Sequence, residues 1–391
     1  MKERLVIIGA SYLQRPLVEK AREMGFETHI FAWEEGAVCK NIGDYFYPIS
    51  ITEIDTILEQ CKKIKPTGIV SIGSDLAVIA VNTIAQELGL ISNSVESTKL
   101  STNKYLMRSS FSAAGIECPK FAKYSAEWSE DYIKGMSYPL IVKPVDRSGS
   151  RGVNLVKNQN DLKSAIKEAE KASLSGEVII EEFIDGRELS IESISWQGKH
   201  YILQYTDKVT SGAPHFIEMS HHQPAFITEK EKEQINTLVL KGLDALKIKY
   251  GASHTEIKIN SKEEMRIIEI GARMGGECIG SDLVQLSTGY DFVRGVIEIA
   301  TGKFNKPQFT ENNYAGIHYI FPKPGILEGV IFKGDSYVVN HEILSKMQDF
   351  IPEIKDSSQR PAYYIYKSDH RIEFDPEQLI LITKSKNDNS I

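Results

Sequence analysis

The chain has 391 residues, more than one ordinary hydrophobic core can organise, which predicts two or three domains. With 41% hydrophobic and 25% charged residues it is neither disordered nor membrane-like, and no apolar run approaches the roughly 20 residues of a spanning helix. A formal net charge of -7 gives no general attraction to phosphodiester polymers. We therefore expect a soluble enzyme with neither a nucleic-acid nor a membrane partner.

The cysteines and the N-terminus favour the cytoplasm. Cys39, Cys61, Cys118 and Cys278 are scattered and show no C-x-x-C spacing. This spacing favours buried thiols in a reducing compartment over disulfides or structural zinc. The apolar run at residues 5–8 is too short for the core of a signal peptide.

The first 95 residues alternate short apolar runs with helical patterns. The runs predict strands at residues 4–8, 27–32 and 68–72. The patterns between and after them predict helices at residues 13–24, 53–63 and 75–88. This order is typical of a small parallel α/β domain.

Two turns of this domain are candidate ligand positions. Residues 9–12 lack the full G-x-G-x-x-G spacing, so a tight turn is favoured over a dinucleotide site. Asp75 follows the end of a strand, where open α/β sheets usually bind ligands, although Asp is also an ordinary residue at the start of a helix. We keep Asp75 as a candidate substrate residue beside that plainer interpretation.

A polar stretch at residues 94–103 marks a predicted domain boundary. Beyond it, the pattern predicts strands at residues 140–143, 153–156 and 178–183 and helices at 160–172 and 229–246. We expect an N-terminal parallel α/β domain at 1–95, a central domain at 96–305 and a small C-terminal domain at 306–391. The predicted fold class is thus a multidomain protein of α/β and α+β type.

A lysine leads from a predicted strand into a glycine-rich loop. After Lys143 the loop contains Ser148, Gly149, Ser150, Gly152 and Val153. The ammonium supplies a point charge, and glycines let backbone N–H groups approach phosphate oxygens without a Cβ in the way. No Gly-Lys-Ser/Thr closes the loop, so it is not a Walker A motif, and an ordinary hairpin turn is the alternative.

Residues 179–190 contain an acidic break between two strand-like segments. The break holds Glu181, Glu182, Phe183 and Ile184, with Glu188 a few residues on. Its backbone groups and a carboxylate can face an adenine edge, with a second carboxylate placed for ribose hydroxyls. Taken alone, the residues favour a plain acidic hairpin.

Residues 254–272 predict an antiparallel hairpin of two alternating strands. We expect Ile268 and Ile270 to be buried on one face. The opposite face should carry Glu256, Lys258, Glu269, Gly271 and Arg273. Two carboxylates on rigid strands suit magnesium, and a neighbouring guanidinium suits a transferred phosphate. A solvent-facing hairpin whose charges pair with one another is the alternative.

These three groups of residues occur in the order and approximate spacing of the ATP-grasp superfamily, which the chain resembles over about residues 94–304. The N-terminal unit is similar to the Rossmann-like domain that precedes the two-lobed ATP-grasp domain in these enzymes. Residues 314–334 are similar to the small C-terminal domain of their carboxylase and amino-acid ligase branches. The resemblance spans amino-acid ligases, purine-pathway ligases and biotin-carboxylase-like enzymes.

The resemblance implies ATP and Mg²⁺ (or Mn²⁺) as cofactors. Lys104 and Lys143 would contact the phosphates, and the loop from Ser148 through Ser150 to Val153 would cover them. The segment Glu181, Glu182, Phe183 and Ile184 would hold adenine, and Glu188 the ribose. Glu256 and Glu269 would bind the metal, and Arg273 would steady an acyl phosphate.

One position departs from the family pattern. Gly271 stands where the family often has Asn, two residues after the second metal glutamate. A metal ligand is missing there, so one or two bound ions both stay open.

The candidate substrate residues are Asp75, His221, Arg273, Gly275 and Gly276. We predict a long polar loop at residues 207–224 that contains His215, His221 and His222. His221 is the preferred substrate or phosphate contact, with an ordinary surface histidine as the alternative. Zinc is only weakly suggested, because further ligands at metal spacing are absent.

The implied reaction begins with a substrate carboxylate attacking the γ-phosphate of ATP, which gives ADP and an acyl phosphate. An amine then displaces phosphate to form an amide. We expect an ADP-forming carboxylate-amine ligase with small-molecule carboxylate and amine substrates, and a homodimer is compatible with the sequence. The alternatives are a purine-pathway carboxylase or formyl-transferring enzyme, and a nucleotide-binding regulatory module without turnover.

Overall fold

The computed structural model describes residues 2–124, 130–149, 151–212 and 216–384. Its N-terminal unit is a parallel sheet whose strands lie in the order β3 (Tyr45–Tyr47), β2 (Glu27–Phe31), β1 (Arg4–Ile8) and β4 (Gly68–Val70). The sheet is connected by η1 (Tyr12–Gln14), α1 (Arg15–Glu23), α2 (Ile54–Ile64) and α3 (Asp75–Glu87). The predicted parallel α/β unit is confirmed.

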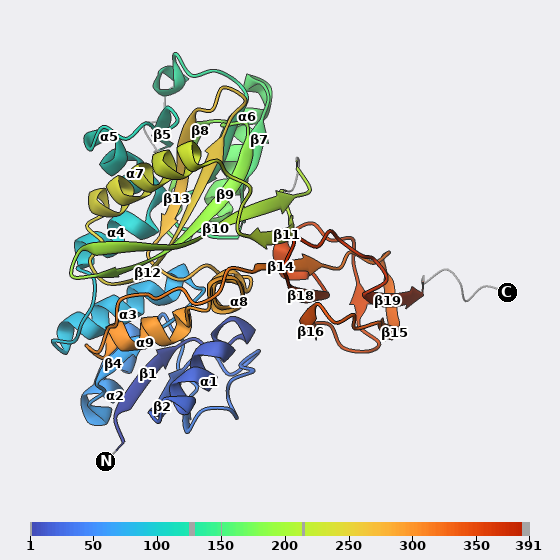
Figure 1. Cartoon of the computed structure of the whole chain (residues 1–391). Helices are drawn as coiled ribbons and strands as arrows, with labels where there is room; N and C mark the ends of the chain where they lie inside the picture. The colour runs from blue at the N-terminus through green and yellow to red at the C-terminus, as the bar shows by residue number, and fades with distance from the viewer. Residues whose placement is uncertain (1, 125–129, 150, 213–215, 385–391) are drawn as a thin grey trace.

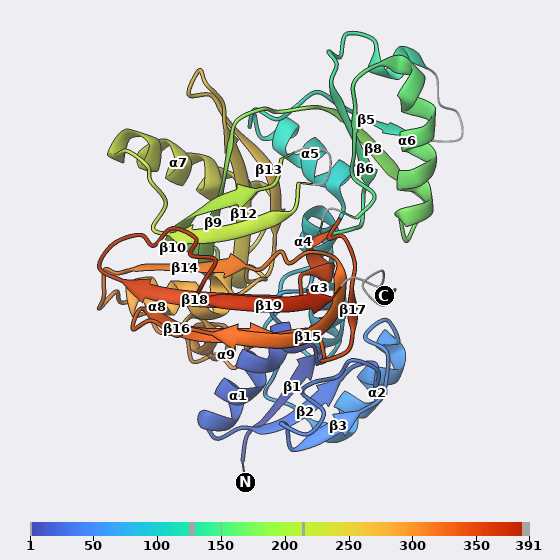
Figure 2. The ribbon, with the colours of Figure 1, turned by 90° about the vertical axis from the view of Figure 1, so that its right-hand side faces the viewer.

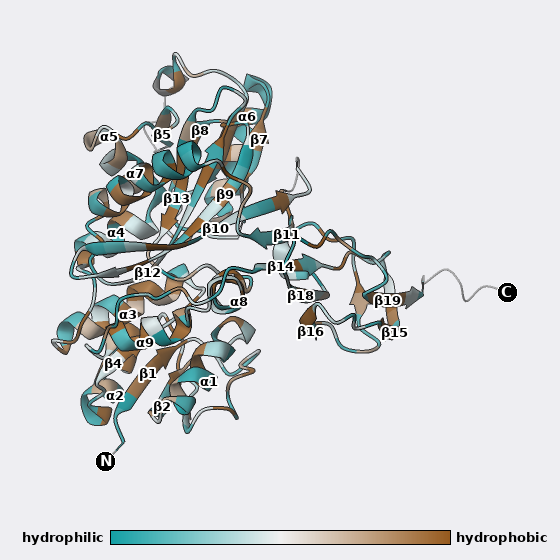
Figure 3. Ribbon diagram, viewed as in Figure 1, coloured by the Kyte–Doolittle hydropathy of each residue, from teal (hydrophilic) through white to brown (hydrophobic). Residues whose placement is uncertain are grey.

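Helices cover both faces of this sheet, and one of them comes from far along the chain. Alternate residues of β1 pack in two directions, with Val6 against α2 and α3, and Leu5 against α1 and α9 (Phe292–Ala300). Strands that are buried on both faces have nearly continuous apolar sequences, and for this reason their positions could be predicted from the sequence. Figure 3 shows these hydrophobic strands and α9 at the base of the molecule.

The stretch at the predicted boundary, residues 94–103, is largely the helix α4 (Val95–Thr102). Ser94 caps its first turn, because the Ser94 side chain accepts a hydrogen bond from the backbone of Ser97. Asn103 ends α4 and caps α5 (Lys104–Ala113) in the same way, through Leu106. Lys104 is therefore held at the first residue of a capped helix.

A small antiparallel sheet forms one lobe of the central region (Figure 1). Its order is β5 (Phe121–Tyr124), β8 (Val178–Glu182), β6 (Leu140–Pro144) and β7 (Asn154–Val156). α6 (Gln159–Ala172) packs on it through Leu162 and Ile166, and η2 (Glu130–Ile133) lies in the connection from β5 to β6.

A larger antiparallel sheet forms the other lobe and continues into the C-terminal region. Its order is β13 (Met265–Gly271), β12 (Gly251–Ile259), β9 (Arg187–Trp196), β10 (Lys199–Thr210), β11 (Glu218–Gln223), β14 (Tyr314–Tyr319), β18 (Ala362–Ser368) and β16 (Val338–Ile343). α5 and α7 (Glu229–Ala245) cover one face of β9, β12 and β13, and Phe111 and Val239 of these helices share a core with Ile257 of β12. The opposite face of these strands is left for polar side chains.

The C-terminal region adds a separate sheet of order β17 (Phe350–Ile351), β15 (Gly325–Phe332) and β19 (Leu379–Lys384), seen at the front of Figure 2. The short helices η3 (Ile279–Leu283), α8 (Val284–Thr288) and η4 (Ser357–Gln359) complete the described elements. The predicted multidomain α/β and α+β class is confirmed. The predicted limit at residue 305 lies between α9 and β14, yet β14 pairs directly with β11, so the large sheet crosses that limit.

The predicted loop at residues 207–224 is wrong, because most of this segment belongs to the strands β10 and β11, which pair in the register Lys208 with His221. The segment is polar because the side chains of β11 enter a buried polar layer; Ser220, His221, His222 and Gln223 are all buried. His215 lies outside the described residues. Among those described, no helix is long and apolar enough to cross a membrane.

Two histidines of this polar layer make stability depend on pH. Burial lowers the pKa of His222 to about 2 and that of His318 on β14 to about 4. Both rings stay neutral in the folded chain, whereas an unfolded chain protonates its histidines below about pH 6.5. Their contribution to stability is therefore present above pH 6.5 and is lost as the pH falls.

We expect the free energy of unfolding to fall between pH 6 and pH 5 by up to ~1.4 kcal/mol for each of these histidines. Urea denaturation at the two pH values measures this slope. Replacing both residues with Gln should flatten it, while His370→Gln, at an exposed position, should leave it unchanged. An equally steep slope in the double variant would contradict the assignment.

Candidate active site

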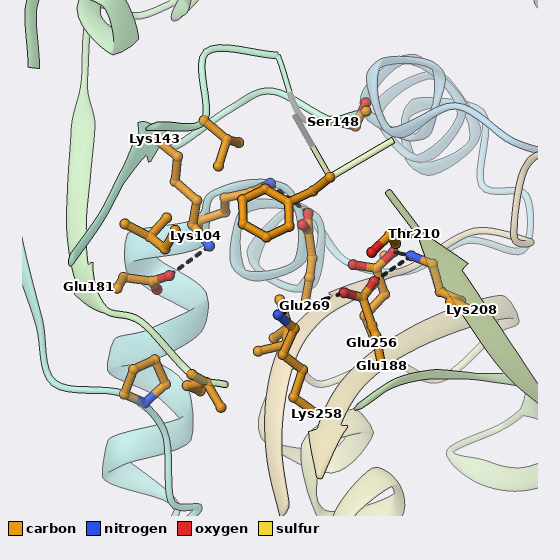
Figure 4. A pocket seen from close by; sticks show the side chains of 18 of the residues that line it. Lys104, Lys143, Ser148, Glu181, Glu188, Lys208, Thr210, Glu256, Lys258 and Glu269 are labelled. Carbon is orange, nitrogen blue, oxygen red and sulfur yellow. Dashed lines mark hydrogen bonds and ion pairs between the residues drawn. The ribbon is translucent and has the colours of Figure 1, made fainter. Parts of the chain in front are cut away.

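A pocket of about 180 Å³ lies between the two lobes of the central region. Its walls come from α5, β6 and β8 on one side and from β10, β12 and β13 on the other (Figure 4). The structure brings together in it most residues that the sequence predicted: Lys104, Lys143, Ser148, Gly149, Val153, Glu181, Glu182, Phe183, Ile184, Glu188, Glu256, Glu269 and Arg273.

On the small lobe, one buried carboxylate holds two cations. Glu181 Oε2 lies 2.6 Å from Lys143 Nζ, and Glu181 Oε1 lies 2.6 Å from Arg108 Nε, although without the angle of a hydrogen bond. Burial opposes the charge on Glu181, but Arg108 and Lys143 outweigh it and lower its pKa. Burial lowers the pKa of Lys143. The Glu181 carboxylate thus faces the two cations.

On the large lobe, the two predicted metal carboxylates lie side by side. Glu256 on β12 and Glu269 on β13 are direct cross-strand partners. Lys104 Nζ donates to Glu269 Oε1 at 2.6 Å and to the carbonyl of Arg147 at 2.7 Å. The first residue of α5 therefore links the glycine-rich loop to the carboxylate pair.

A β-bulge corrects one prediction about this hairpin. The register shifts after Glu256, so that Ile257 pairs with Ile267 and Ile268 is the extra residue. Ile267 and Ile270 enter the core, whereas Ile268 lines the pocket beside Glu269. The prediction that Ile268 is buried on the opposite face is wrong for this reason.

Lys208 on β10 is a central pocket residue that the sequence analysis missed, because its segment was taken for a loop. Its Nζ lies 2.8 Å from both Glu188 and Glu256 and 3.9 Å from Glu218. Burial disfavours the ammonium, but these three carboxylates outweigh that cost and raise its pKa well above the usual value. Figure 4 shows it facing the two nearest carboxylates.

The pocket also contains an aromatic end. The rings of Phe183 and Phe216 lie 6.4 Å apart, and Lys258 Nζ lies 5.0 Å from the centre of the Phe183 ring. Ile141 and Ile184 add apolar surface nearby. Such a wall suits a planar base, while the lysines at the other end suit phosphates. The sequence analysis also missed the lining residues Arg147, Thr210, Phe216, Glu218 and His254.

Arg273 joins the pocket to the N-terminal unit. Its Nε donates to Asp75 Oδ1 at 2.9 Å and its Nη2 donates to Oδ2 at 3.1 Å. Asp75 is the first residue of α3, and residues 71–74 connect it to the carboxyl end of β4. Burial opposes both charges, yet the pairing lowers the pKa of Asp75 and raises that of Arg273. Asp75 therefore orients Arg273 and does not line the pocket itself.

Known proteins are similar to this chain in sequence and in architecture. Residues 136–281 match a family model described as ATP-grasp domain. The chain contains an ATP-grasp domain. The alanine-anticapsin ligase of Bacillus subtilis is 23% identical over 360 residues, covering 77% of this chain and 75% of that protein.

Two solved structures have a fold similar to that of this chain. The L-amino acid ligase from Bacillus licheniformis has a TM-score of 0.85 at 22% identity, covering 98% of this chain and 100% of that one. The phosphoribosylglycinamide synthetase from Anaerococcus prevotii has a TM-score of 0.80 at 20% identity, with the same coverage. The predicted ATP-grasp fold and the predicted class of ATP-grasp ligase agree with these findings.

The geometry gives a reason for the departure of Gly271 from the ATP-grasp pattern. A Cβ at this position would lie 3.0 Å from Asp75 Oδ1 and 3.3 Å from Arg273 Cζ. A larger side chain would therefore crowd the pair that crosses from the N-terminal unit. Glycine leaves room for that pair and supplies no metal ligand.

The carboxylate pair fits magnesium. Glu256 and Glu269 offer hard oxygen donors next to lysines that suit phosphates, and magnesium is commonly held by one or two carboxylates together with substrate phosphates and water. Within the described ranges, no cluster of three or more His, Cys, Asp or Glu residues could hold a metal ion. The faint suggestion of zinc near the histidines therefore has no support among the described residues.

Several predicted residues lie away from the pocket. His221 is a buried strand residue, contrary to the prediction of a loop histidine, and its Nε2 lies 3.0 Å from Glu277, which also pairs with Arg360. Gly276 abuts the turn at Gly73. Gly152 packs on Ala172, Gly275 on Glu192, and Ser150 lies outside the described residues.

Proposed function

We propose that the chain is an ADP-forming carboxylate-amine ligase that works through an acyl phosphate. The observation that carries the proposal is the convergence of Lys104, Lys143, Glu256, Glu269 and Arg273 on one pocket, from four separate segments of the chain. Such a set matches a triphosphate with its metal ion, and phosphoryl transfer depends chiefly on positioning and charge stabilisation.

In this proposal the aromatic end of the pocket receives adenine, and Glu188 receives the ribose. Lys104 and Lys143 hold the phosphates beside the loop residues Ser148, Gly149 and Val153, which also line the pocket. When bound to Glu256 and Glu269, Mg²⁺ would neutralise charge on the phosphate oxygens. The loop excludes water, which would otherwise hydrolyse the acyl phosphate.

In this proposal Arg273, which lines the pocket, contacts the transferred phosphoryl group. A substrate carboxylate oxygen attacks the γ-phosphorus, and ADP leaves. The amine nitrogen then attacks the acyl carbon, phosphate leaves, and the nitrogen loses a proton to give the amide. Arg273, oriented by Asp75, would stabilise the phosphate in both steps.

The relatives favour small amino acids or similar metabolites as substrates. The alanine-anticapsin ligase and the L-amino acid ligase support this choice by their names. The structural likeness to the phosphoribosylglycinamide synthetase favours a purine-pathway ligase as the second candidate. A regulatory module that binds ATP without turnover is the alternative from another class.

A substrate screen tests the proposal. The chain is incubated with MgATP and pooled amino acids and carboxylates, ADP release is measured, and the products are identified by mass. ADP release that depends on a carboxylate and an amine, with an amide product, is the expected result. A product formed only with a phosphoribosylamine would favour the purine pathway. Firm ATP binding without ADP release from any pool would favour the regulatory module.

A further inference from the structure

A buried pair of side chains, one of which lines the pocket, is joined to one of the proposed metal carboxylates. Glu192 on β9 and His254 on β12 are direct cross-strand partners, and both are buried. His254 Nδ1 is hydrogen-bonded to Glu192 Oε1, and His254 Nε2 lies 3.3 Å from Glu256 Oε1. The imidazole therefore bridges a carboxylate in the sheet interior and a carboxylate of the pocket.

The same pair is tied to the loop after β13. The backbone N–H of Gly275 donates to Glu192 Oε2 at 2.9 Å. A Cβ at Gly275 would lie 2.5 Å from Glu192 Oε1 and 2.7 Å from His254 Nδ1, closer than such atoms can approach. Glycine is required here because Glu192 and His254 occupy the space that a side chain would need. Glu192 and His254 thus connect the loop at Gly275 to Glu256.

The contacts on Glu256 favour one orientation of its carboxylate. His254 Nε2 and Lys208 Nζ both contact Oε1, the latter at 2.8 Å. Between the residues that the structure describes, both hydrogen bonds to this carboxylate end on Oε1 and none ends on Oε2. Two donors thus fix one oxygen, and the other is left to coordinate a cation.

A purely structural role explains these contacts poorly. Burying a carboxylate and an imidazole costs free energy, and apolar side chains of similar volume are often as stable in such a place. On the same face, the next cross-strand pair of these two strands, Ile194 with Ala252, consists of apolar core residues. The polar pair lies next to Glu256 on the same face of the sheet.

We propose that Glu192 and His254 are positioning residues that orient Glu256 toward a divalent cation and couple it to the Gly275 loop beside Arg273. The inference deepens the proposed function and rests on it, since it takes Glu256 as a metal ligand. Residues that orient metal ligands in this way typically contribute about 10- to 100-fold to metal affinity.

The test measures how much Mg²⁺ tightens the binding of ADP to the full chain, by calorimetry with Mg²⁺ and with EDTA. In His254→Phe we expect the metal-dependent gain in affinity to fall at least about 10-fold. ADP affinity in EDTA should change less than about 2-fold, because the base and phosphate contacts remain. Glu256→Gln should abolish the tightening of ADP binding by Mg²⁺, and it serves as the reference variant.

His200→Phe is the matched control. His200 lies on β10 in the same sheet and bridges Ser195 and Asp244 at 2.7 Å and 3.2 Å, away from the pocket. It should keep the full gain. Glu192→Gln, nearly isosteric, and Gly275→Ala, which pushes a methyl group against the pair, should both lower the gain; they also serve if His254→Phe does not fold.

The outcomes separate the inference from the function on which it rests. Loss of the gain in Glu256→Gln, with a normal gain in the His254, Glu192 and Gly275 variants, overturns the positioning role and leaves the proposed ligase intact. A normal gain in Glu256→Gln removes the metal assignment and the inference together. A loss in His200→Phe equal to that in His254→Phe overturns the inference, because it would reflect general loosening of the sheet.

Discussion

Glu269→Ala should lower magnesium-dependent ADP formation at least about 100-fold while the chain keeps its fold. Glu269 shares the pocket with Glu256, its cross-strand partner, and a single proposed carboxylate ligand would remain for the metal ion. The side chain is partly exposed, and Lys104 keeps its second bond, to the carbonyl of Arg147. The loss should therefore appear in turnover rather than in folding.

Coupled measurement of ADP release and far-ultraviolet circular dichroism checks both halves of this prediction. Glu263→Ala is the control, because Glu263 lies in the turn of the same hairpin with an exposed side chain paired to Lys230. It should retain normal turnover. Turnover of Glu269→Ala within about 3-fold of the unmodified chain would remove the metal role.

The N-terminal unit could be predicted almost completely because its signals are local. Strands buried on both faces give continuous apolar runs, and helix starts such as Ser74 before Asp75 carry their own caps. The contribution of α9 to the same core could not be predicted, since Phe292 meets β1 only through the folding of the whole central region.

The site residues on the β6–β7 and β12–β13 hairpins could be predicted from the sequence, whereas those on β10 and β11 could not. Alternation places Glu256 and Lys258 on one face without knowledge of the fold. Lys208 and His221 were misjudged because a strand that faces a buried polar layer has the composition of a loop. Ile268 was misplaced because one bulged residue reverses the alternation beyond it.

Pairings between distant residues mark the limit of sequence reasoning. Lys104 with Glu269, and Arg273 with Asp75, join segments more than 150 residues apart. The resemblance supplied Lys104, Glu269 and Arg273 as members of a site, and the position after a strand supplied Asp75. Neither gave the ion pairs of the Glu181 carboxylate with Arg108 and Lys143. A sequence shows which residues carry charge, but which of these charges lie together and buried is decided only when the two lobes assemble.

Because the Glu181 carboxylate compensates two buried cations, we expect the stability of the small lobe to depend on it. Glu181→Gln should lower the free energy of unfolding by about 3–5 kcal/mol, because it leaves two buried cations without their anion. Burial lowers the pKa of Lys143, so this ammonium can release its proton to relieve part of the cost. Arg108, which is 1% exposed, stays charged in proteins and cannot do so.

Urea denaturation without nucleotide measures the cost, and Glu177→Gln is the matched control. Glu177 pairs with Lys123 beside the same sheet, but both side chains are about one-third exposed, and such pairs contribute about 0–1 kcal/mol. A phosphate ligand that reaches Lys143 should recover part of the loss in Glu181→Gln and none in the control. Equal destabilisation in the two variants would show that Arg108 and Lys143 do not need Glu181, and the charge arrangement described for this wall of the pocket would be wrong.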